Sequence, residues 1–349
     1  MNDGDILILK GHEVDEILTG RELQLMQTVG KAYEVHHAGQ SSLPHSTFLR
    51  FAKNDQNRII ALPAYLGGDF EVAGMKWISS FPGNIDLGLE RASALTVLNS
   101  ALTGRPEAIL EGSLISAKRT AASAVLAAKT LMVDQEISTI GLVGAGFINF
   151  EVVRFLVASC AELSKLRVFD LDPERATQFQ NKCHETFDRV EVEVMHDMKD
   201  VFRNTSLISL ATTATTPYID DLSHCDPGTV ILHVSLRDLS PEVILDADNV
   251  VDDVDHVCRA NTSVHLTEQL VGNRDFIRCS LAEILKGSAS ARRDKDSIVI
   301  FSPFGLGVLD LAVAALVRDQ AIANRMGTRL SSFIRETWVG GCEASRVSA

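Results

Sequence analysis

The sequence is poor in positive charge and in long hydrophobic runs. Only 33 of its 349 residues are Lys or Arg, against 46 Asp or Glu, so the formal net charge is −13 at pH 7. A surface this negative repels phosphate backbones and anionic lipids, which argues against nucleic acid or a membrane as the partner. No apolar stretch approaches the roughly 18–20 residues of a membrane span. A small molecule is therefore the expected partner.

Cysteine is sparse and shows no pairing pattern. The six cysteines form no CxxC motif and have no histidine at zinc-finger spacing, which argues against a disulfide framework and against a structural metal site. The first ten residues carry acids at Asp3 and Asp5 and only a short apolar run, unlike a secretory signal peptide. We therefore predict a cytoplasmic protein with no bound metal.

Apolar residues, by contrast, are abundant. They make up 46% of a chain that is too long for one ordinary core, which predicts two domains. The first 130 residues have a mixed, mostly antiparallel pattern. Its expected elements are a helix over 15–38, strands at 58–65 and 71–78, a second strand pair at 95–102 and 108–111, and an Ala-rich helix over 113–132.

The pattern changes near residue 131, where strands and helices begin to alternate. The expected strands are 137–143, 166–169, 190–194, 207–211, 230–234, 250–251 and 298–301. Such alternation predicts a parallel, doubly wound sheet, followed here by a helix over 309–326 that packs back on the first part of the chain. We therefore predict an α/β fold with a Rossmann-type doubly wound domain at 131–314. The other domain, called the first domain because the chain begins in it, is mixed α+β and comprises 1–130 and 315–349.

A glycine turn, Gly144-Ala145-Gly146, links the first of these strands to a helix that begins at Phe147. Gly144 permits a tight turn, and Gly146 lets a pyrophosphate approach the helix N-terminus. Asn149 stands where the dinucleotide fingerprint has its third glycine, which requires the helix to sit slightly further from the sheet. The alternative is a glycine turn in a Rossmann-like domain that binds no nucleotide.

The strand after this turn ends in Asp170, 24 residues beyond Gly146, close to the spacing of an acid that binds ribose hydroxyls. A carboxylate there repels the 2′-phosphate of NADP and so favours NAD as cofactor, although Arg175 nearby leaves NADP open. The residues predicted to bind the cofactor are Gly144, Gly146, Phe147, Ile148, Asn149, Asp170, Thr212 and Ser235.

Three cations of the first 130 residues, Arg50, Lys76 and Arg119, lie among apolar or small neighbours. Such side chains either extend to the surface or face a cleft, and for any one of them the surface is the more common place. Their shared location in an acidic protein favours carboxylate recognition. Arg can bind a carboxylate through two parallel N–H bonds, and Lys supplies a point charge or a tunable amine.

Asp238 follows the strand at 230–234 and lies at its carboxyl end, where ligands bind in open α/β sheets. An Asp there can act as a general acid or base, or it can cap the next helix, a role for which Ser240 competes. Both interpretations remain open from the pattern alone. His233 is interpreted as a packed histidine at the strand end.

Segments 74–84, 114–122 and 141–149 resemble the ornithine cyclodeaminase/μ-crystallin family, and the similarity covers about residues 10–335. This resemblance implies a homodimer in which the first domain binds substrate and dimerises, while the 131–314 domain binds NAD. It also implies that Arg50, Lys76 and Arg119 bind substrate and that Asp238 and Lys76 are catalytic. Segment 302–310 resembles a loop-to-helix element that lies beside the nicotinamide in this family.

The residues after Asp238, Leu239-Ser240-Pro241-Glu242, differ from the Pro-Gly-Lys-Thr-Glu type segment of true ornithine cyclodeaminases. Segments 235–239 and 58–69 instead resemble a branch that makes 2,3-diaminopropionate for siderophores and peptide antibiotics. The implied reaction is NAD-dependent oxidative hydrolysis of N-(1-amino-1-carboxy-2-ethyl)-glutamate to 2,3-diaminopropionate and 2-oxoglutarate. The alternatives are an ornithine cyclodeaminase, an alanine dehydrogenase, a ketimine reductase, and a non-catalytic ligand-binding protein.

Overall fold

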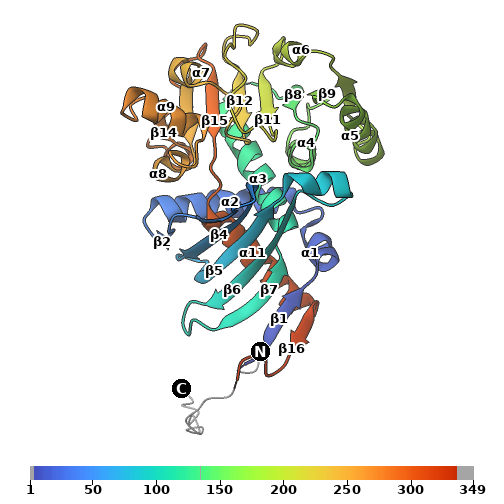
Figure 1. Ribbon diagram of the computed structural model, residues 1–349, viewed down its shortest axis with the longest axis vertical. Coiled ribbons are helices and arrows are strands. Elements are labelled where there is room, and N and C mark those ends of the chain that lie inside the picture. The colour runs from blue at the N-terminus through green and yellow to red at the C-terminus, as the bar shows by residue number, and fades with distance from the viewer. Residues whose placement is uncertain (1–3, 134, 336–349) are drawn as a thin grey trace.

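The computed structural model describes residues 4–133 and 135–335 and contains two sheets, one above the other in Figure 1. The first sheet has the strand order β16-β1-β7-β6-β5-β4-β2, with β3 also paired to β4. Its strands are β1 Ile6–Leu9, β2 Ser41–Ser42, β3 Thr47–Phe51, β4 Asn54–Leu66, β5 Val72–Ser80, β6 Ala92–Ser100, β7 Pro106–Glu111 and β16 Thr328–Leu330. The two expected antiparallel pairs are β4–β5 and β6–β7. The short outer strands β1, β2, β3 and β16 were not predicted.

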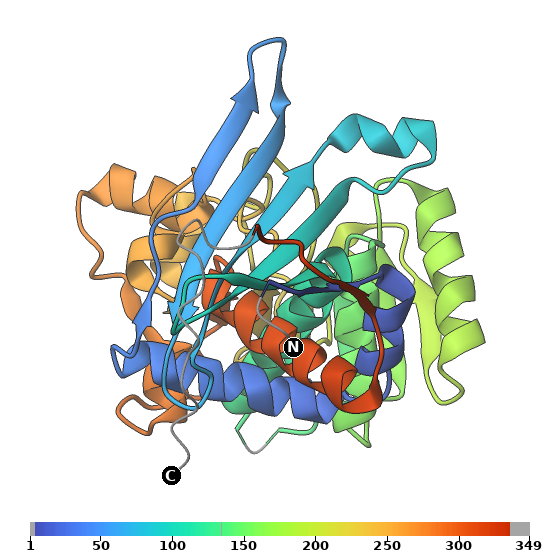
Figure 2. The same cartoon turned by 90° about the horizontal axis from the view of Figure 1, so that it is seen from below.

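The helices on this sheet are α1 Gly11–Leu18, α2 Glu22–His37, α3 Ser113–Leu131 and α11 Gly307–Asn324, and the 3₁₀ helix η1 Pro82–Leu87 precedes β6. The segment expected to be helical over 15–38 is broken because Gly20 adopts a φ of 74°, which a continuing helix does not allow. Helix α11 returns from the second sheet and packs on β4, β5 and α2, as the red and blue helices of Figure 2 show.

The second sheet is parallel throughout, as predicted, with the order β10-β9-β8-β11-β12-β15-β13-β14. Its strands are β8 Thr139–Val143, β9 Lys165–Phe169, β10 Glu191–Val194, β11 Leu207–Leu210, β12 Val230–His233, β13 Asp248–Val251, β14 Ile277–Ser280 and β15 Val299–Ser302. Its helices are α4 Phe147–Ser159, α5 Pro173–Thr186, α6 Met198–Phe202, α7 Pro241–Asp246, α8 Val254–Val257, α9 Ser263–Val271 and α10 Leu281–Leu285. The chain order reverses between β8 and β11, where such sheets bind ligands.

Helix α3 joins the two sheets. It packs on α2 and β6 on one side and on α4, β12 and β15 on the other, and its alanines, among them Ala121, Ala124 and Ala128, are buried and allow this close approach. One continuous hydrophobic cluster therefore runs through both layers, and the α/β fold class is confirmed. Of the predicted C-terminal part of the first domain, 315–349, residues 336–349 lie outside the described residues. No helix in the described ranges is long and apolar enough to cross a membrane.

Candidate functional site

The glycine turn at the end of β8 has the shape that a dinucleotide requires. Gly144 has a φ of +95°, and a Cβ added to it would lie 2.5 Å from the carbonyl oxygen of Ala211, so only glycine fits. A Cβ added to Gly146 would meet no protein atom within 4 Å. No side chain caps the N-terminus of α4 behind it in the described structure. Open space therefore faces backbone N–H groups that suit a pyrophosphate, and Phe147 and Ile148 form the first turn of that helix.

The side chain of Asn149 links this turn to the second sheet through hydrogen bonds. Its Nδ2 donates to the carbonyl oxygens of Val143 (3.1 Å) and Gly144 (2.7 Å), and its Oδ1 accepts a hydrogen bond from Ser209 Oγ at 2.7 Å. The side chain is fully buried. Asn149 thus holds α4 against β8 and β11 and satisfies carbonyl groups that a third glycine would leave to other partners.

Asp170 lies beside the same turn. Its Oδ2 accepts a hydrogen bond from the backbone N–H of Ala145 at 2.7 Å, and its Oδ1 accepts one from the N–H of Asp172 at 3.0 Å. The carboxylate remains partly exposed. An acid in this position is within reach of the ribose hydroxyls of a nucleotide whose pyrophosphate lies at Gly146.

Asp238 is buried at the carboxyl ends of β11 and β12. Its Oδ1 accepts hydrogen bonds from Thr212 Oγ1 and, at 3.1 Å, from Tyr218 Oη, and its Oδ2 accepts one from Ser235 Oγ. Thr212 and Ser235, both predicted from the sequence as cofactor-binding, therefore meet at the predicted catalytic carboxylate. Tyr218 was missed, because no sequence spacing places its loop beside Asp238.

The surroundings of Asp238 keep it ionised. Burial raises the pKa of this carboxyl, but contacts with His233, Ser235 and Thr212 outweigh burial and lower the pKa to about 2. His233 is a buried histidine at the strand end, as interpreted: its Nε2 lies 3.2 Å from the backbone nitrogen and 3.3 Å from the carboxylate Oδ2 of Asp238. The cap of α7 is Ser240, whose Oγ accepts from Val243 N–H, so Asp238 is not the helix cap.

A buried charge centre joins β5, α3 and α11. The Nζ of Lys76 lies 2.9 Å from both carboxylate oxygens of Asp310 and 3.0 Å from Ser116 Oγ. The Nε of Arg119 lies 3.1 Å from Asp310 Oδ1. Asp310 was missed as a site residue, although a lone acid among the apolar and small residues of 307–317 was the available signal. With one anion against two cations, this centre carries one net positive charge.

The charge centre is balanced so that Lys76 can lose its proton near neutral pH. Burial lowers the pKa of Lys76 more than Asp310 raises it, and the pKa falls to about 8. Burial raises the pKa of Asp310, but Arg119 and Lys76 outweigh burial and hold it below its usual value. The segment at 302–310 packs directly on this centre, since a Cβ added to Gly305 would lie 2.9 Å from Arg119 Nη1.

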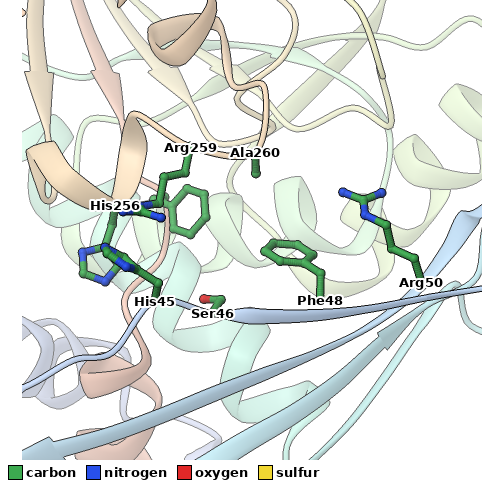
Figure 3. Close-up of a pocket in the computed structure, with 8 residues that line it drawn as sticks. His45, Ser46, Phe48, Arg50, His256, Arg259 and Ala260 are labelled. Atoms are coloured by element: carbon green, nitrogen blue, oxygen red, sulfur yellow. The ribbon is translucent and has the colours of Figure 1, made fainter.

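Arg50 does not join Lys76 and Arg119. It is exposed on β3 with its guanidinium carbon 5.7 Å from the centre of the Phe48 ring. Both residues line a cavity of about 200 Å³, and His256 and Arg259 lie across it from the strand (Figure 3). Of the three predicted substrate cations, the structure therefore brings two together and places the third in the wall of a cavity that the other two do not line.

These features define a two-layer α/β protein in which a dinucleotide-type glycine turn and a buried cationic centre share one chain. Residues 6–325 match the ornithine cyclodeaminase/mu-crystallin family, and the chain belongs to that family. Among the described residues, no group of three or more His, Cys, Asp or Glu is arranged to hold a metal ion.

Relatives within the family differ in reaction. The chain is 28% identical over 282 residues to the N-((2S)-2-amino-2-carboxyethyl)-L-glutamate dehydrogenase of Staphylococcus aureus, which covers 79% of this chain and 83% of the relative. The Δ(1)-pyrroline-2-carboxylate reductase of Thermococcus litoralis, solved with NADH and L-proline, superposes with a TM-score of 0.85 at 24% identity, covering 93% and 99% of the two chains. An archaeal alanine dehydrogenase dimer with bound NAD gives a TM-score of 0.83 at 24% identity, covering 94% and 99%. The two structures establish a shared fold.

Proposed function

We propose that the protein is an NAD-dependent dehydrogenase that converts N-((2S)-2-amino-2-carboxyethyl)-L-glutamate and water to 2,3-diaminopropionate and 2-oxoglutarate. The same compound is also written N-(1-amino-1-carboxy-2-ethyl)-glutamate. The observation that carries the proposal is the buried centre of Lys76, Arg119 and Asp310, whose net positive charge suits an amino-acid carboxylate. The Staphylococcus aureus relative supports the choice of substrate.

The residues around the glycine turn fit NAD. The open space at Gly146 and the N-terminus of α4 would hold its pyrophosphate, and Asp170 would accept hydrogen bonds from its ribose hydroxyls. The same carboxylate would repel the 2′-phosphate of NADP. When bound, NAD supplies the acceptor for the hydride that leaves the glutamyl Cα.

Lys76 and Arg119 would orient the carboxylate next to that carbon. Both cations form hydrogen bonds to the carboxylate of Asp310. These bonds fix the positions of the two cations before substrate binds. Preorganised positioning of this kind is a large part of catalysis, because the substrate is held close to a reactive geometry. Asp310 is then a positioning residue, since it acts through the two cations.

The remaining chemistry is proton transfer, which we assign to Asp238. Loss of the hydride leaves a C=N bond; water adds to its carbon, and the C–N bond then breaks to give the ketone of 2-oxoglutarate and the free amine of 2,3-diaminopropionate. One proton is released overall. The Asp238 carboxylate is ionised and buried behind the hydroxyl groups of Ser235, Thr212 and Tyr218, so it would accept a proton through one of them.

Product analysis separates this function from its alternatives. The protein would be incubated with NAD and, in turn, the proposed substrate, L-ornithine and L-alanine, with NADH absorbance and mass spectrometry as readouts. We expect NADH, 2,3-diaminopropionate and 2-oxoglutarate in equal amounts. Formation of proline and ammonia from ornithine without net NADH would establish a cyclodeaminase. Formation of NADH and pyruvate from alanine would establish an alanine dehydrogenase. Reduction of a cyclic imine by NADH would indicate a ketimine reductase, and binding without turnover a ligand-binding protein.

We also propose that the protein is a cytoplasmic homodimer, with 1–130 and 315–349 as the substrate and dimerisation domain and 131–314 as the NAD domain. The face of the first sheet that carries Leu49 and Leu95 supports this: both are exposed, by 47% and 39%, and apolar surface of this kind marks interfaces. Sedimentation equilibrium should show a dimer that Leu95→Glu dissociates, while Leu171→Glu, at a 91% exposed position in the loop between β9 and α5, leaves it intact.

A further inference from the structure

Two arginines and a serine form a row across the first sheet. Arg50 on β3 is in register with Arg58 on β4, and Arg58 is in register with Ser80 on β5. Residues directly opposite on neighbouring strands share a face of the sheet. Arg91, just before β6, donates from Nη1 to Ser80 Oγ at 3.2 Å, which brings a third guanidinium to this face.

A fourth arginine, Arg237, lies in a loop of the second sheet. Arg237 follows β12 and donates from Nη2 to the carbonyl oxygen of Ala260 at 2.7 Å, and Ala260 lines the same cavity as Arg50. Burial lowers the pKa of Arg58, and the charges of Arg237, Arg91 and Arg50 lower it further. We call Arg50, Arg58, Arg91 and Arg237 the arginine cluster.

The arginine cluster lacks ion-pair partners, although the charge of Asp238 acts on Arg237. Among the side chains that the structure describes, no carboxylate forms an ion pair with any of these four arginines, and the buried Nε of Arg58 has no hydrogen-bond partner. Like charges facing one another across strands destabilise a sheet. Four unpaired arginines in a protein of net charge −13 therefore indicate a site that an anion completes.

The arginine cluster and the charge centre share one face of the sheet. Lys76 and Ser80 are four residues apart on β5, an even spacing that points both side chains to the same side, with about 13 Å between their Cα atoms. The charge centre has one net positive charge, enough for one carboxylate, because Asp310 cancels the other. A substrate with further carboxylates needs a second cationic site along this face.

We propose that the arginine cluster is a second anion subsite that binds the distal carboxylate of a dicarboxylic or tricarboxylic amino-acid substrate and so selects against substrates with a single carboxylate. This inference rests on the proposed function for the first carboxylate site. Arg58 is its central residue, because it is flanked by Arg50 and Ser80 and has the buried, unpartnered Nε. Such a cluster would favour glutamate-type over alanine-type substrates at this site.

Binding of products and analogues tests the subsite without requiring turnover. Calorimetric titration of the NADH-loaded protein would compare 2-oxoglutarate, which has a distal carboxylate, with 2-oxobutyrate, which lacks it. We expect 2-oxoglutarate to bind at least tenfold more tightly, and Arg58→Gln to remove most of that preference while changing 2-oxobutyrate affinity little. Lys53→Gln, which removes one exposed positive charge from the same β3–β4 hairpin, should leave the preference intact.

The thermal stability of the variants distinguishes a ligand-binding role of the arginine cluster from a structural one. Without ligand, Arg58→Gln should keep or raise the melting temperature, since it relieves repulsion; Arg237→Gln provides a second variant should Arg58→Gln fail to fold. Equal binding of the two oxoacids, or a preference unchanged in both variants, would overturn the subsite. If the proposed substrate is not oxidised but the dicarboxylate preference persists and depends on Arg58, the proposed function fails and the subsite stands.

Discussion

Lys76 on β5 and Asp310 on α11, 234 residues apart in sequence, form a buried ion pair in which Nζ lies 2.9 Å from both carboxylate oxygens. Arg119 from α3 completes the arrangement. The pair is the point at which the returning helix is fixed to the first sheet, so stability and carboxylate binding depend on the same three side chains.

Asp310→Asn should be strongly destabilising. It leaves Lys76 and Arg119 buried beside each other without a counter-charge, and breaking a buried pair in this way costs about 3–5 kcal/mol. Chemical denaturation followed by circular dichroism measures the free energy of unfolding. Asp319→Asn on the same helix, which removes an exposed pair with Arg318, should change it by about 1 kcal/mol or less. Equal effects of the two substitutions would contradict the structural role of the centre.

The pH dependence of catalysis should report Lys76. Its pKa, lowered to about 8 by burial, means that the ammonium is present below pH 8 and is lost as the pH rises above it. We expect kcat/KM for the substrate to fall above about pH 8, because kcat/KM follows the ionisation of the free enzyme. Lys76→Arg keeps its charge throughout this range, so its profile should stay flat there. Parallel profiles for the two proteins would exclude Lys76 as the titrating group.

Asn149→Gly should weaken the protein even though it restores the three-glycine fingerprint. The substitution removes three buried hydrogen bonds, to Val143, Gly144 and Ser209. The Val143 carbonyl keeps its bond from Ala211 N–H, but the Gly144 carbonyl loses its donor and the Ser209 hydroxyl loses its acceptor, and a buried polar group left unsatisfied costs about 1–3 kcal/mol. Thermal unfolding and NAD titration measure the two consequences, lower stability and weaker cofactor binding. Asn204→Gly, an exposed position with a φ of 51°, should be nearly neutral, since glycine adopts that conformation readily. A stable Asn149→Gly protein with intact NAD affinity would show that the Asn149 bonds are dispensable.

Asp170 should determine the choice of cofactor. NAD is expected to bind much more tightly than NADP because the carboxylate accepts from ribose hydroxyls and repels a 2′-phosphate. Asp170→Ser should narrow that difference, as measured by fluorescence titration with NADH and NADPH. Asp172→Ser, two residues away at the cap of α5, should leave it unchanged. Equal affinity for both cofactors in the unmodified protein would refute the assignment.

Asp238→Asn should abolish turnover and leave NAD binding nearly intact. General acid–base groups contribute on the order of 10²–10⁴-fold to rate, and an amide cannot accept the proton. Single-turnover NADH formation measures the loss, and circular dichroism confirms folding. Asp246→Asn at the exposed end of α7 should retain full activity. Undiminished turnover in Asp238→Asn would remove this carboxylate from the mechanism.

Features that depend on a short stretch of chain could be predicted from the sequence. The strand, glycine turn and helix around Gly144 and Gly146 follow from local hydrophobicity and from the conformations that glycine allows. Asp170 could be predicted as a ribose-binding residue, because it ends the next strand at the expected number of residues after the glycine turn. Lys76, Arg119 and Asp238 could be predicted as candidate site residues, because a charged residue among apolar neighbours can be recognised in the sequence.

Only the tertiary structure decided which charges meet. Asp310 pairs with Lys76 because α11 returns across the first sheet. Arg50 stands apart from Lys76 because it pairs with Arg58 on β4, four residues from Leu62, the β4 partner of Lys76. The arginine cluster depends on the register of three strands and on a loop from the second sheet. Strand register and helix docking are set by packing between segments distant in sequence, and one-dimensional spacing carries little information about either.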